Sequence, residues 1–147
     1  SRGLLRELDV VLAAVHSGFK AGGEVITKRV IKAMESGLIH ILVHPTGRII
    51  NRRSPYEIDL FRIIDKAKEL GIFLEINAFP DRLDLRDVQI KSAVDKGVGL
   101  AVGTDSHSKN HLNFMEYGVD QARRGWCTKN NLVNTLELSE IEKKFGV

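Results

Sequence analysis

The chain has 147 residues, of which 43% are hydrophobic, and its 22 basic and 19 acidic side chains give a net charge of +3. This length fits one globular domain but falls short of the about 250 residues of a closed eight-unit β/α barrel, so any barrel here is incomplete. The mild positive charge would support phosphate binding but is no strong nucleic-acid footprint.

The single cysteine, Cys127, excludes an internal disulfide and a multi-cysteine zinc site. No apolar run approaches the roughly 20 residues of a membrane span, and no signal peptide is visible. We therefore expect a soluble protein in a reducing, cytoplasmic compartment. A helix-to-strand transition follows almost directly on Ser1, which suggests further sequence upstream.

Short apolar runs alternate with helical patterns along the whole chain. Strands are expected within residues 7–17, 38–45, 72–80 and 98–107, and helices within residues 22–37, 54–71 and 85–97, followed by a longer helical end. The strands are almost continuously apolar, which is typical of a parallel sheet covered by helices. The pattern predicts an α/β domain of about four parallel βα units.

The helix within residues 54–71 carries the clearest helical period. Ser54 is a candidate N-cap, Pro55 would occupy the first helical position, and Gly71 would end the helix. Along it, Ile58, Phe61, Ile64, Ala67 and Lys68 follow a 3.6-residue period, which predicts a helix.

Polar side chains follow the predicted strands at the points where the strands end. In parallel α/β folds these ends converge on one rim, where functional groups gather. The candidates are His16, His44, Asn77, Asp105 and His107.

His16 and His44 are the natural pair of nitrogen ligands for a divalent metal, which separate strand ends can bring together. Asp105 and His107, two residues apart, either share a face or straddle a turn and meet different ions. Metal ions at such a rim could lower the pKa of a bound water to about 7 and clamp a phosphate. Hydrolysis of a phosphoester is the chemistry that fits this pattern.

The other histidines and the cysteine have simpler interpretations. A single histidine at a strand end is more often a hydrogen-bonded loop residue than a ligand, and only the number of candidates at one rim reverses that expectation. His40 lies early in its strand and is expected to be packed, while His111 is expected to be capping and solvated. We expect Trp126 to pack on the core, with stacking on a nucleobase as the less favoured role, and Cys127 to be a core residue rather than a nucleophile.

Four arginines, Arg48, Arg52, Arg53 and Arg82, lie in the predicted rim loops, and arginine matches phosphate oxygens bidentately. Arg48, four residues beyond His44, is the first candidate for a catalytic phosphate-binding residue. Glu75 and Asn77 share one face of their strand and are expected to orient ligands, although an ordinary Glu–Arg pair would explain Glu75 equally well. With Arg82 they form the predicted outer part of the site.

These motifs together resemble a known family. The chain carries VHSGF at 15–19, VHPTGR at 43–48, PYEIDL at 55–60, LEINAFPDRLDL at 74–85, TDSH at 104–107 and YGVDQARRGW at 117–126. In this order and spacing they resemble the PHP (polymerase and histidinol phosphatase) domain, and most closely that of bacterial and archaeal family X DNA polymerases. The resemblance spans nearly the whole chain. We therefore expect residues 1–147 to form a single, partial domain of this family.

The resemblance implies a distorted (β/α)7 barrel whose rim binds up to three divalent ions, zinc or manganese, and hydrolyses phosphoesters. On that pattern His16 and His44 would share one ion, Asp105 would bind a second and His107 a third. In the polymerases the domain is associated with 3′–5′ exonuclease and related DNA repair activities. The chain would therefore act on DNA or another phosphoester.

The chain departs from the family pattern in its first half. The HxH strand and the further ligands that open the family's barrel are missing, so the chain reads as the C-terminal half of the domain, weakly active alone. The missing half and a polymerase core are its expected partners, and its uncovered sheet edges predict a homo-oligomer. Two alternatives remain: a non-catalytic docking module of a polymerase, and a histidinol-phosphatase-like enzyme for small phosphate esters.

Overall fold

A four-stranded parallel sheet in the order β1-β2-β3-β4 runs through the computed structural model, which describes residues 2–147. The strands are β1 Leu12–Ala13, β2 Ile41–Leu42, β3 Phe73–Asn77 and β4 Leu100–Gly103. The α-helices are α1 Arg2–Leu5, α2 Gly23–Met34, α3 Leu60–Leu70, α4 Asp87–Asp95, α5 Met115–Arg124 and α6 Leu138–Phe145. Three 3₁₀ helices, η1 Lys109–Phe114, η2 Lys129–Asn131 and η3 Val133–Thr135, connect the last elements.

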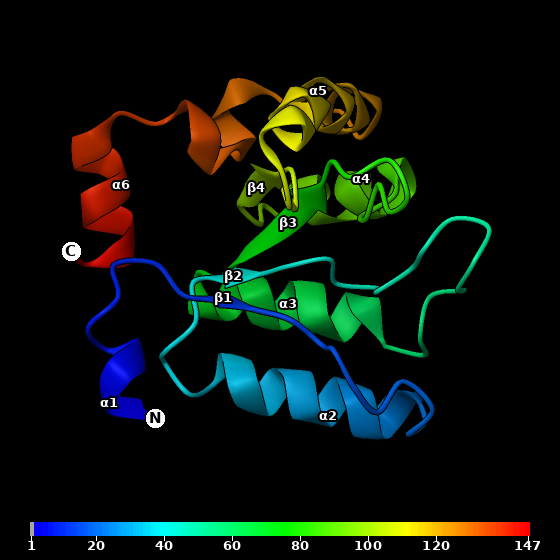
Figure 1. Cartoon of the computed structure of the whole chain (residues 1–147). Helices are drawn as coiled ribbons and strands as arrows, with labels where there is room; N and C mark the ends of the chain where they lie inside the picture. The colour runs from blue at the N-terminus through cyan, green and yellow to red at the C-terminus, as the bar shows by residue number, and fades with distance from the viewer. Residues whose placement is uncertain (1) are drawn as a thin grey trace.

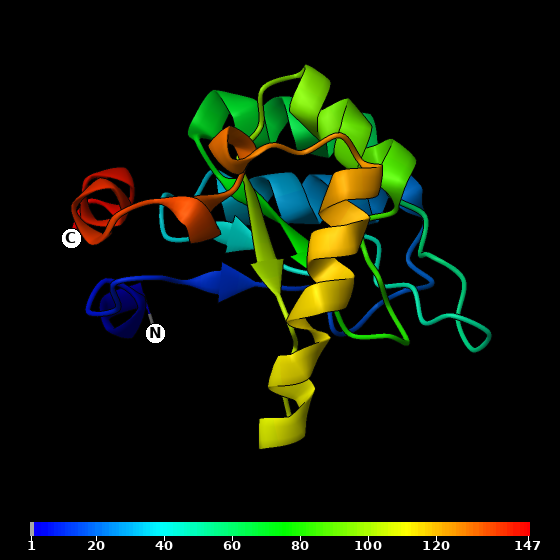
Figure 2. The same cartoon turned by 90° about the horizontal axis from the view of Figure 1, so that it is seen from above.

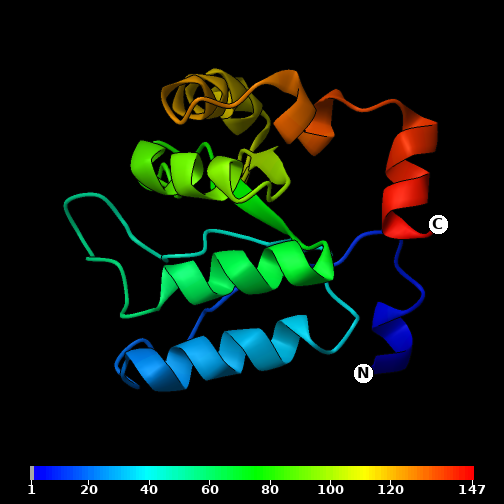
Figure 3. The same ribbon diagram turned by 180° about the vertical axis from the view of Figure 1, so that it is seen from behind.

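Helices α2, α3 and α4 lie on one side of the sheet. They lie behind the strands in Figure 1 and in front of them in Figure 3, where the molecule is turned by 180°. Strands β1, β2 and β3 are each followed by a helix and pair in parallel with the next strand, as the alternating pattern predicts. This is the arrangement of consecutive units of a β/α barrel, and the predicted fold class is confirmed.

The core forms where the helices meet the sheet. Its fully buried side chains come from α2, α3, α4 and the two longer strands, and include Ile26, Met34, Ile63, Leu74, Ile76, Ile90 and Leu100. A smaller cluster joins Ile41, Phe73 and Ala101 to Phe145 of α6. The ring of His40 lies 5.2 Å from that of Phe145, and its Nδ1 accepts the N–H of Val11, so His40 is packed as expected.

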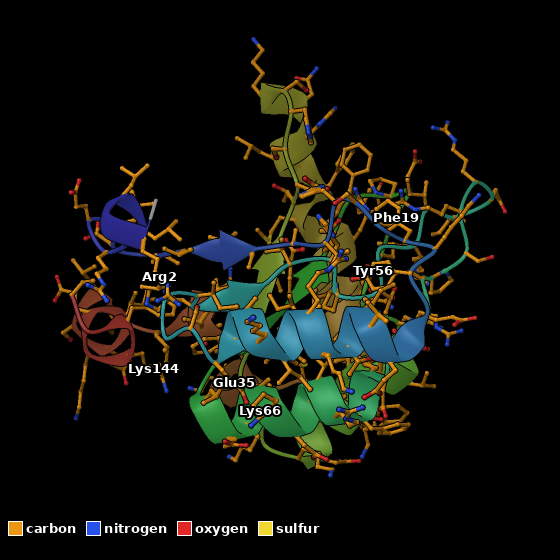
Figure 4. All side chains as sticks on the ribbon, turned by 90° about the horizontal axis from the view of Figure 1, so that it is seen from below. Arg2, Phe19, Glu35, Tyr56, Lys66 and Lys144 are labelled. Atoms are coloured by element: carbon orange, nitrogen blue, oxygen red, sulfur yellow. The ribbon has the colours of Figure 1, made fainter. Side chains whose placement is uncertain are left out.

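Helices α2 and α3 are joined by contacts at both ends. Lys66 Nζ lies 3.2 Å from Glu35 Oε1, and at the opposite end the ring of Phe19 stacks on that of Tyr56 at 5.7 Å. Figure 4 labels both pairs. The Tyr56 hydroxyl donates to the carbonyl of Pro45, which ties together the two ends of the loop between β2 and α3. The rim loops are therefore tied to the packed layer.

The prediction for the start of α3 is wrong. The helix begins at Leu60 rather than at Pro55, and its N-cap is Asp59, whose Oδ1 accepts the N–H of Arg62 at 3.1 Å. Tyr56, in the segment before the helix, is buried and bonds to the carbonyl of Pro45 instead of lying in the first turn. Gly71 ends the helix with φ 68°, as predicted.

Two aromatic residues are largely exposed. Phe61 is 68% exposed, because Ile63, Ile64 and Ala67 form the buried face of α3. Trp126 is 66% exposed rather than packed on the core as expected, whereas Cys127 packs against the main core and burial raises the pKa of its thiol to about 11. The expectation that Cys127 is no nucleophile is consistent with that pKa. Within residues 2–147 the structure holds no helix with the length and apolar character that crossing a membrane requires.

Candidate active site

The two predicted histidine ligands lie side by side. His16 follows β1 and His44 follows β2, and these strands pair with Leu12 opposite Ile41. The ring centroids of the two histidines are 5.2 Å apart with an angle of 77° between the planes. Adjacent strand ends thus bring together two imidazoles that are 28 positions apart in sequence.

His44 is the buried member of the pair. Only 5% of it is exposed, and its Nδ1 has no hydrogen-bond partner among the described residues. Burial, with a smaller contribution from the nearby positive charge of Arg82, lowers the pKa of His44 to about 4. The ring is therefore neutral near pH 7, which is the form that binds metals.

Glu75 and Asn77 of β3 support His44 from the neighbouring strand. Glu75 Oε2 accepts the N–H of His44 at 2.6 Å and the side-chain amide of Asn77 at 3.2 Å. Burial raises the pKa of Glu75 to about 7. A Cβ atom at Gly103 would overlap the Glu75 carboxylate, so the glycine before Thr104 leaves room for this group. The shared face predicted for Glu75 and Asn77 is present.

Asp105 lies at the end of β4, where Arg82 meets it. Arg82 Nε donates to Asp105 Oδ2 at 3.0 Å, and Arg82 Nη1 is buried without a partner within residues 2–147. Asp105 also interacts electrostatically with His44. His44 and Asp105 both have positive φ, 34° and 50°, a costly conformation for residues other than glycine that recurs at functional sites.

His107 is exposed and is fixed by local hydrogen bonds. Its Nδ1 bonds with the carbonyl oxygen of Asp105 at 2.7 Å, and its N–H donates to Nδ1 of His111 at 3.1 Å. His111 is therefore not simply solvated: it is half-buried in η1 and stacks on Phe114 with centroids 5.1 Å apart. The expected capping role of His111 agrees with its bond to the N–H of His107 just before η1, whereas the expected solvation is only partial, because its ring contacts Phe79 and Phe114.

The loop after β2 is held by a buried carboxylate that the sequence reasoning did not single out. Asp84 Oδ2 accepts the N–H groups of Thr46 and Gly47 at 3.0 and 2.9 Å. Burial raises the pKa of Asp84, against the opposing effect of those donors. An aspartate just before a buried leucine is only a weak sequence signal for such a role, because nothing nearby in the sequence shows that its carboxylate accepts the N–H groups of a distant loop.

The arginines of the rim have different partners. Arg48 donates from Nε to the carbonyl of Arg82 at 2.7 Å and from Nη2 to the carbonyl of Leu83. Arg53 donates to the carbonyl of Gly47 from Nε and Nη2, and Arg52 lies 3.7 Å from Asp81. Of these four side chains, Arg82 is the one in direct contact with Asp105.

The residues at hand match part of a metal site. The neutral His44 ring with an unpartnered Nδ1, next to His16, supplies the nitrogen donors that zinc-type ions prefer. Asp105, the nearest carboxylate donor, is paired with Arg82. Within residues 2–147 no three His, Cys, Asp or Glu side chains form a group that could hold a metal ion. The histidine pair therefore fits two ligand positions of such a site, and the remaining positions need other ligands.

Comparison with known proteins gives relatives of two kinds. The chain is 41% identical over 139 residues to the DNA polymerase/3′-5′ exonuclease PolX of Bacillus subtilis, covering 95% of this chain and 24% of PolX. It is 28% identical over 159 residues to a probable phosphatase of Thermoanaerobacter sp. strain X514, covering 98% of this chain and 62% of the phosphatase. A probable phosphatase of Tolumonas auensis is 33% identical over 121 residues.

The chain spans about a quarter of PolX and less than two thirds of these phosphatases. No protein-family model matches it. The match to PolX nevertheless extends over 95% of this chain at 41% identity. The resemblance of this chain to part of the bacterial family X DNA polymerases is thereby confirmed.

Proposed function

We propose that the chain is the phosphoesterase module of a PolX-like protein and hydrolyses DNA ends in the 3′–5′ direction with the help of divalent metal ions. The observation that carries this proposal is the edge-to-face pair of His16 and His44, with its buried, unpartnered nitrogen, beside the Asp105–Arg82 ion pair. A polymerase core and further metal ligands would be supplied by other parts of the parent protein.

Each side chain of the rim has a proposed role. His16 and His44 bind one cation, and Asp105 and His107 contribute to neighbouring ions. Arg82 binds a phosphate oxygen of the substrate through the part of its guanidinium that Asp105 does not engage. Glu75 and Asn77 fix the backbone of His44. When bound, zinc or manganese supplies Lewis acidity and neutralises phosphate charge.

Arg48 and Asp84 act on the site through its loops. Arg48 holds the carbonyls of Arg82 and Leu83, and Asp84 holds the backbone of Thr46 and Gly47, two and three residues after His44. We therefore propose positioning roles for both, and the catalytic role predicted for Arg48 passes to Arg82.

A second candidate function is hydrolysis of small phosphate monoesters, which the probable phosphatases among the relatives favour. The same metal and phosphate groups would serve both reactions. The two functions differ in whether the protein contacts nucleotides beyond the cleaved phosphate, so one assay with two substrates separates them.

The test is hydrolysis of an aryl phosphate and of a single-stranded oligonucleotide with added Mn²⁺, by the chain and by the longer protein containing it. We expect turnover by the longer protein, weak turnover by the chain, and a loss of more than about a hundredfold in His44→Ala, because a metal ligand is removed. His40→Gln is the matched control, since His40 lies at the other end of its strand and glutamine keeps an acceptor for Val11.

Unchanged hydrolysis in His44→Ala would remove the assignment of the site. A longer protein that hydrolyses neither substrate and contains no metal by elemental analysis would support the non-catalytic docking module instead.

A further inference from the structure

A column of aromatic rings extends from the candidate active site along η1 into α5. His111 stacks on Phe114 at 5.1 Å with an interplanar angle of 19°, and Phe114 stacks on Tyr117 at 5.9 Å and 29°. Phe79, from the loop after β3, meets the first two rings edge-on at 5.2 and 5.3 Å. The column ends at Tyr117, which is 43% exposed.

The local backbone explains this column. In a 3₁₀ helix, side chains three residues apart lie directly above one another, and η1 has this geometry from Lys109 to Phe114. His111 and Phe114 are three residues apart, and Tyr117 continues the same spacing into the first turn of α5. Figure 2 shows η1 extending away from the rest of the molecule. The rings are therefore presented on a projecting element.

Tyr117 also lines a pocket that is rich in arginine. The pocket has a volume of about 460 Å³ and lies between the loop after β3, α4 and α5. Arg48, Arg86 and Arg124 line it together with Tyr117, Asp87 and Asp120, and Arg124 is paired with Asp87 at 2.9 Å. This volume lies in the range of small-ligand sites. An exposed aromatic ring beside several guanidinium groups is the combination that binds single-stranded nucleic acid.

The column and the pocket are both connected to the candidate active site. His111 accepts the N–H of His107, which in turn bonds to the backbone of Asp105. Arg48 lines the pocket and also holds the carbonyl of Arg82, the partner of Asp105. A strand with its terminal phosphodiester at Arg82 would therefore run past surfaces that bind bases and phosphates.

We propose that Tyr117, backed by Phe114 and His111, stacks a base of a single-stranded DNA substrate, while Arg86 and Arg124 face its phosphates. The inference rests on the proposed phosphoesterase function and specifies its substrate as a strand held through nucleotides beyond the cleaved phosphodiester. A small phosphate monoester would use neither surface.

The experiment compares how variants of the 147-residue chain bind two labelled strands in the presence of a chelator. Fluorescence anisotropy measures the binding. The probes are a labelled oligothymidylate and an abasic strand of the same length, which keeps the phosphates and lacks the bases. We expect Tyr117→Leu to weaken oligothymidylate binding on the order of tenfold, and to leave abasic binding unchanged. Tyr117→Phe should bind like the wild type, because the ring is kept.

Two further variants serve as controls. Arg86→Gln should weaken both strands equally, because it removes a phosphate contact. Phe61→Leu removes an exposed ring from α3, 68% exposed against 43% for Tyr117, and should change the binding of neither strand. Equal losses for both strands in Tyr117→Leu, no loss for either, or no binding of oligothymidylate by the wild type would each overturn the stacking role.

Failure of this inference and failure of the proposed function give different results, since binding is measured without metal. A protein that hydrolyses aryl phosphate with Mn²⁺ and fails the binding test loses only the nucleotide subsite. A protein that passes the binding test and hydrolyses neither substrate loses only the catalytic assignment.

Discussion

Arg48 and Arg82 look alike in the sequence, as arginines in loops of the same rim, but their contacts differ. Two nitrogens of Arg48 donate to backbone carbonyls. In Arg82 one nitrogen donates to Asp105, and another is buried without a partner within residues 2–147. Proximity to His44 in the sequence favoured Arg48. The sequence does not show that the Arg48 side chain turns toward residues 82 and 83, because contacts remote in sequence set the conformation of its loop.

We therefore predict that one substitution mainly lowers stability and the other mainly lowers hydrolysis. Arg48→Met should lower the free energy of unfolding by about 2 kcal/mol, since two carbonyls lose their donors, and should reduce Mn²⁺-dependent hydrolysis by the folded molecules much less than Arg82→Met does, because Arg48 only positions the loop of Arg82. Arg82→Met should reduce hydrolysis strongly and stability less, because its ion pair is partly solvated. Urea unfolding and initial rates measure the two effects. Arg48→Met that keeps full stability and loses hydrolysis would restore the catalytic role predicted from the sequence.

At the scale of elements, the sequence predicted the order of strands and helices and the glycine that ends α3. It also placed His16, His44 and Asp105 after the strands that the structure gives them, because apolar runs and turn residues are local signals. It could not predict that α3 begins at Leu60 or that Phe61 faces solvent, since both depend on the packing of Tyr56 and α2. The positive φ of His44 and Asp105 likewise follows from tertiary contacts.

The loop after β2 is the element on which the position of His44 depends, and Gly47 tests it. Gly47 has φ 62°, and a Cβ there would overlap the ring of Tyr56. Gly37→Ala is the matched control, because Gly37 has φ 68° with no atom near its Cβ position. We expect Gly37→Ala to cost about 1 kcal/mol, and Gly47→Ala to cost a further 1–3 kcal/mol or so from the clash. Thermal unfolding of both variants measures the difference, and equal losses would show that the Tyr56 contact is not rigid.

At the scale of the whole molecule, the sheet ends in two different edges. Residues 132–134 cover the β4 edge, through a bridge between Leu100 and Leu132 and hydrogen bonds between Val102 and Asn134, whereas β1 pairs only with β2 among the described residues. Leu12 of the edge strand β1 is 57% exposed. Unpaired strand edges with apolar side chains favour association with another chain. The sequence predicts this open edge only through the resemblance to a larger barrel, because strand periodicity does not show where a sheet ends.

We predict that the chain self-associates at high concentration and that Leu12→Lys reduces this association, since a charged side chain at an edge opposes strand pairing. Light scattering over a concentration series measures the average mass. Val25→Lys, an equally exposed apolar position on α2, is the control and should leave the association unchanged. A wild-type chain that stays monomeric throughout the series would contradict the prediction.

The central claim is that His16 and His44 act together on one cation. Calorimetric titration of the chain with Mn²⁺ or Zn²⁺ tests it most directly, using the wild type, His16→Ala, His44→Ala and the double variant. We expect fewer than three tight sites per chain. We also expect either single substitution to weaken metal binding about as much as the double one, because the effects of substituting two residues that bind the same ion are not additive. Additive losses from the two single variants, or binding that survives the double substitution unchanged, would contradict the account.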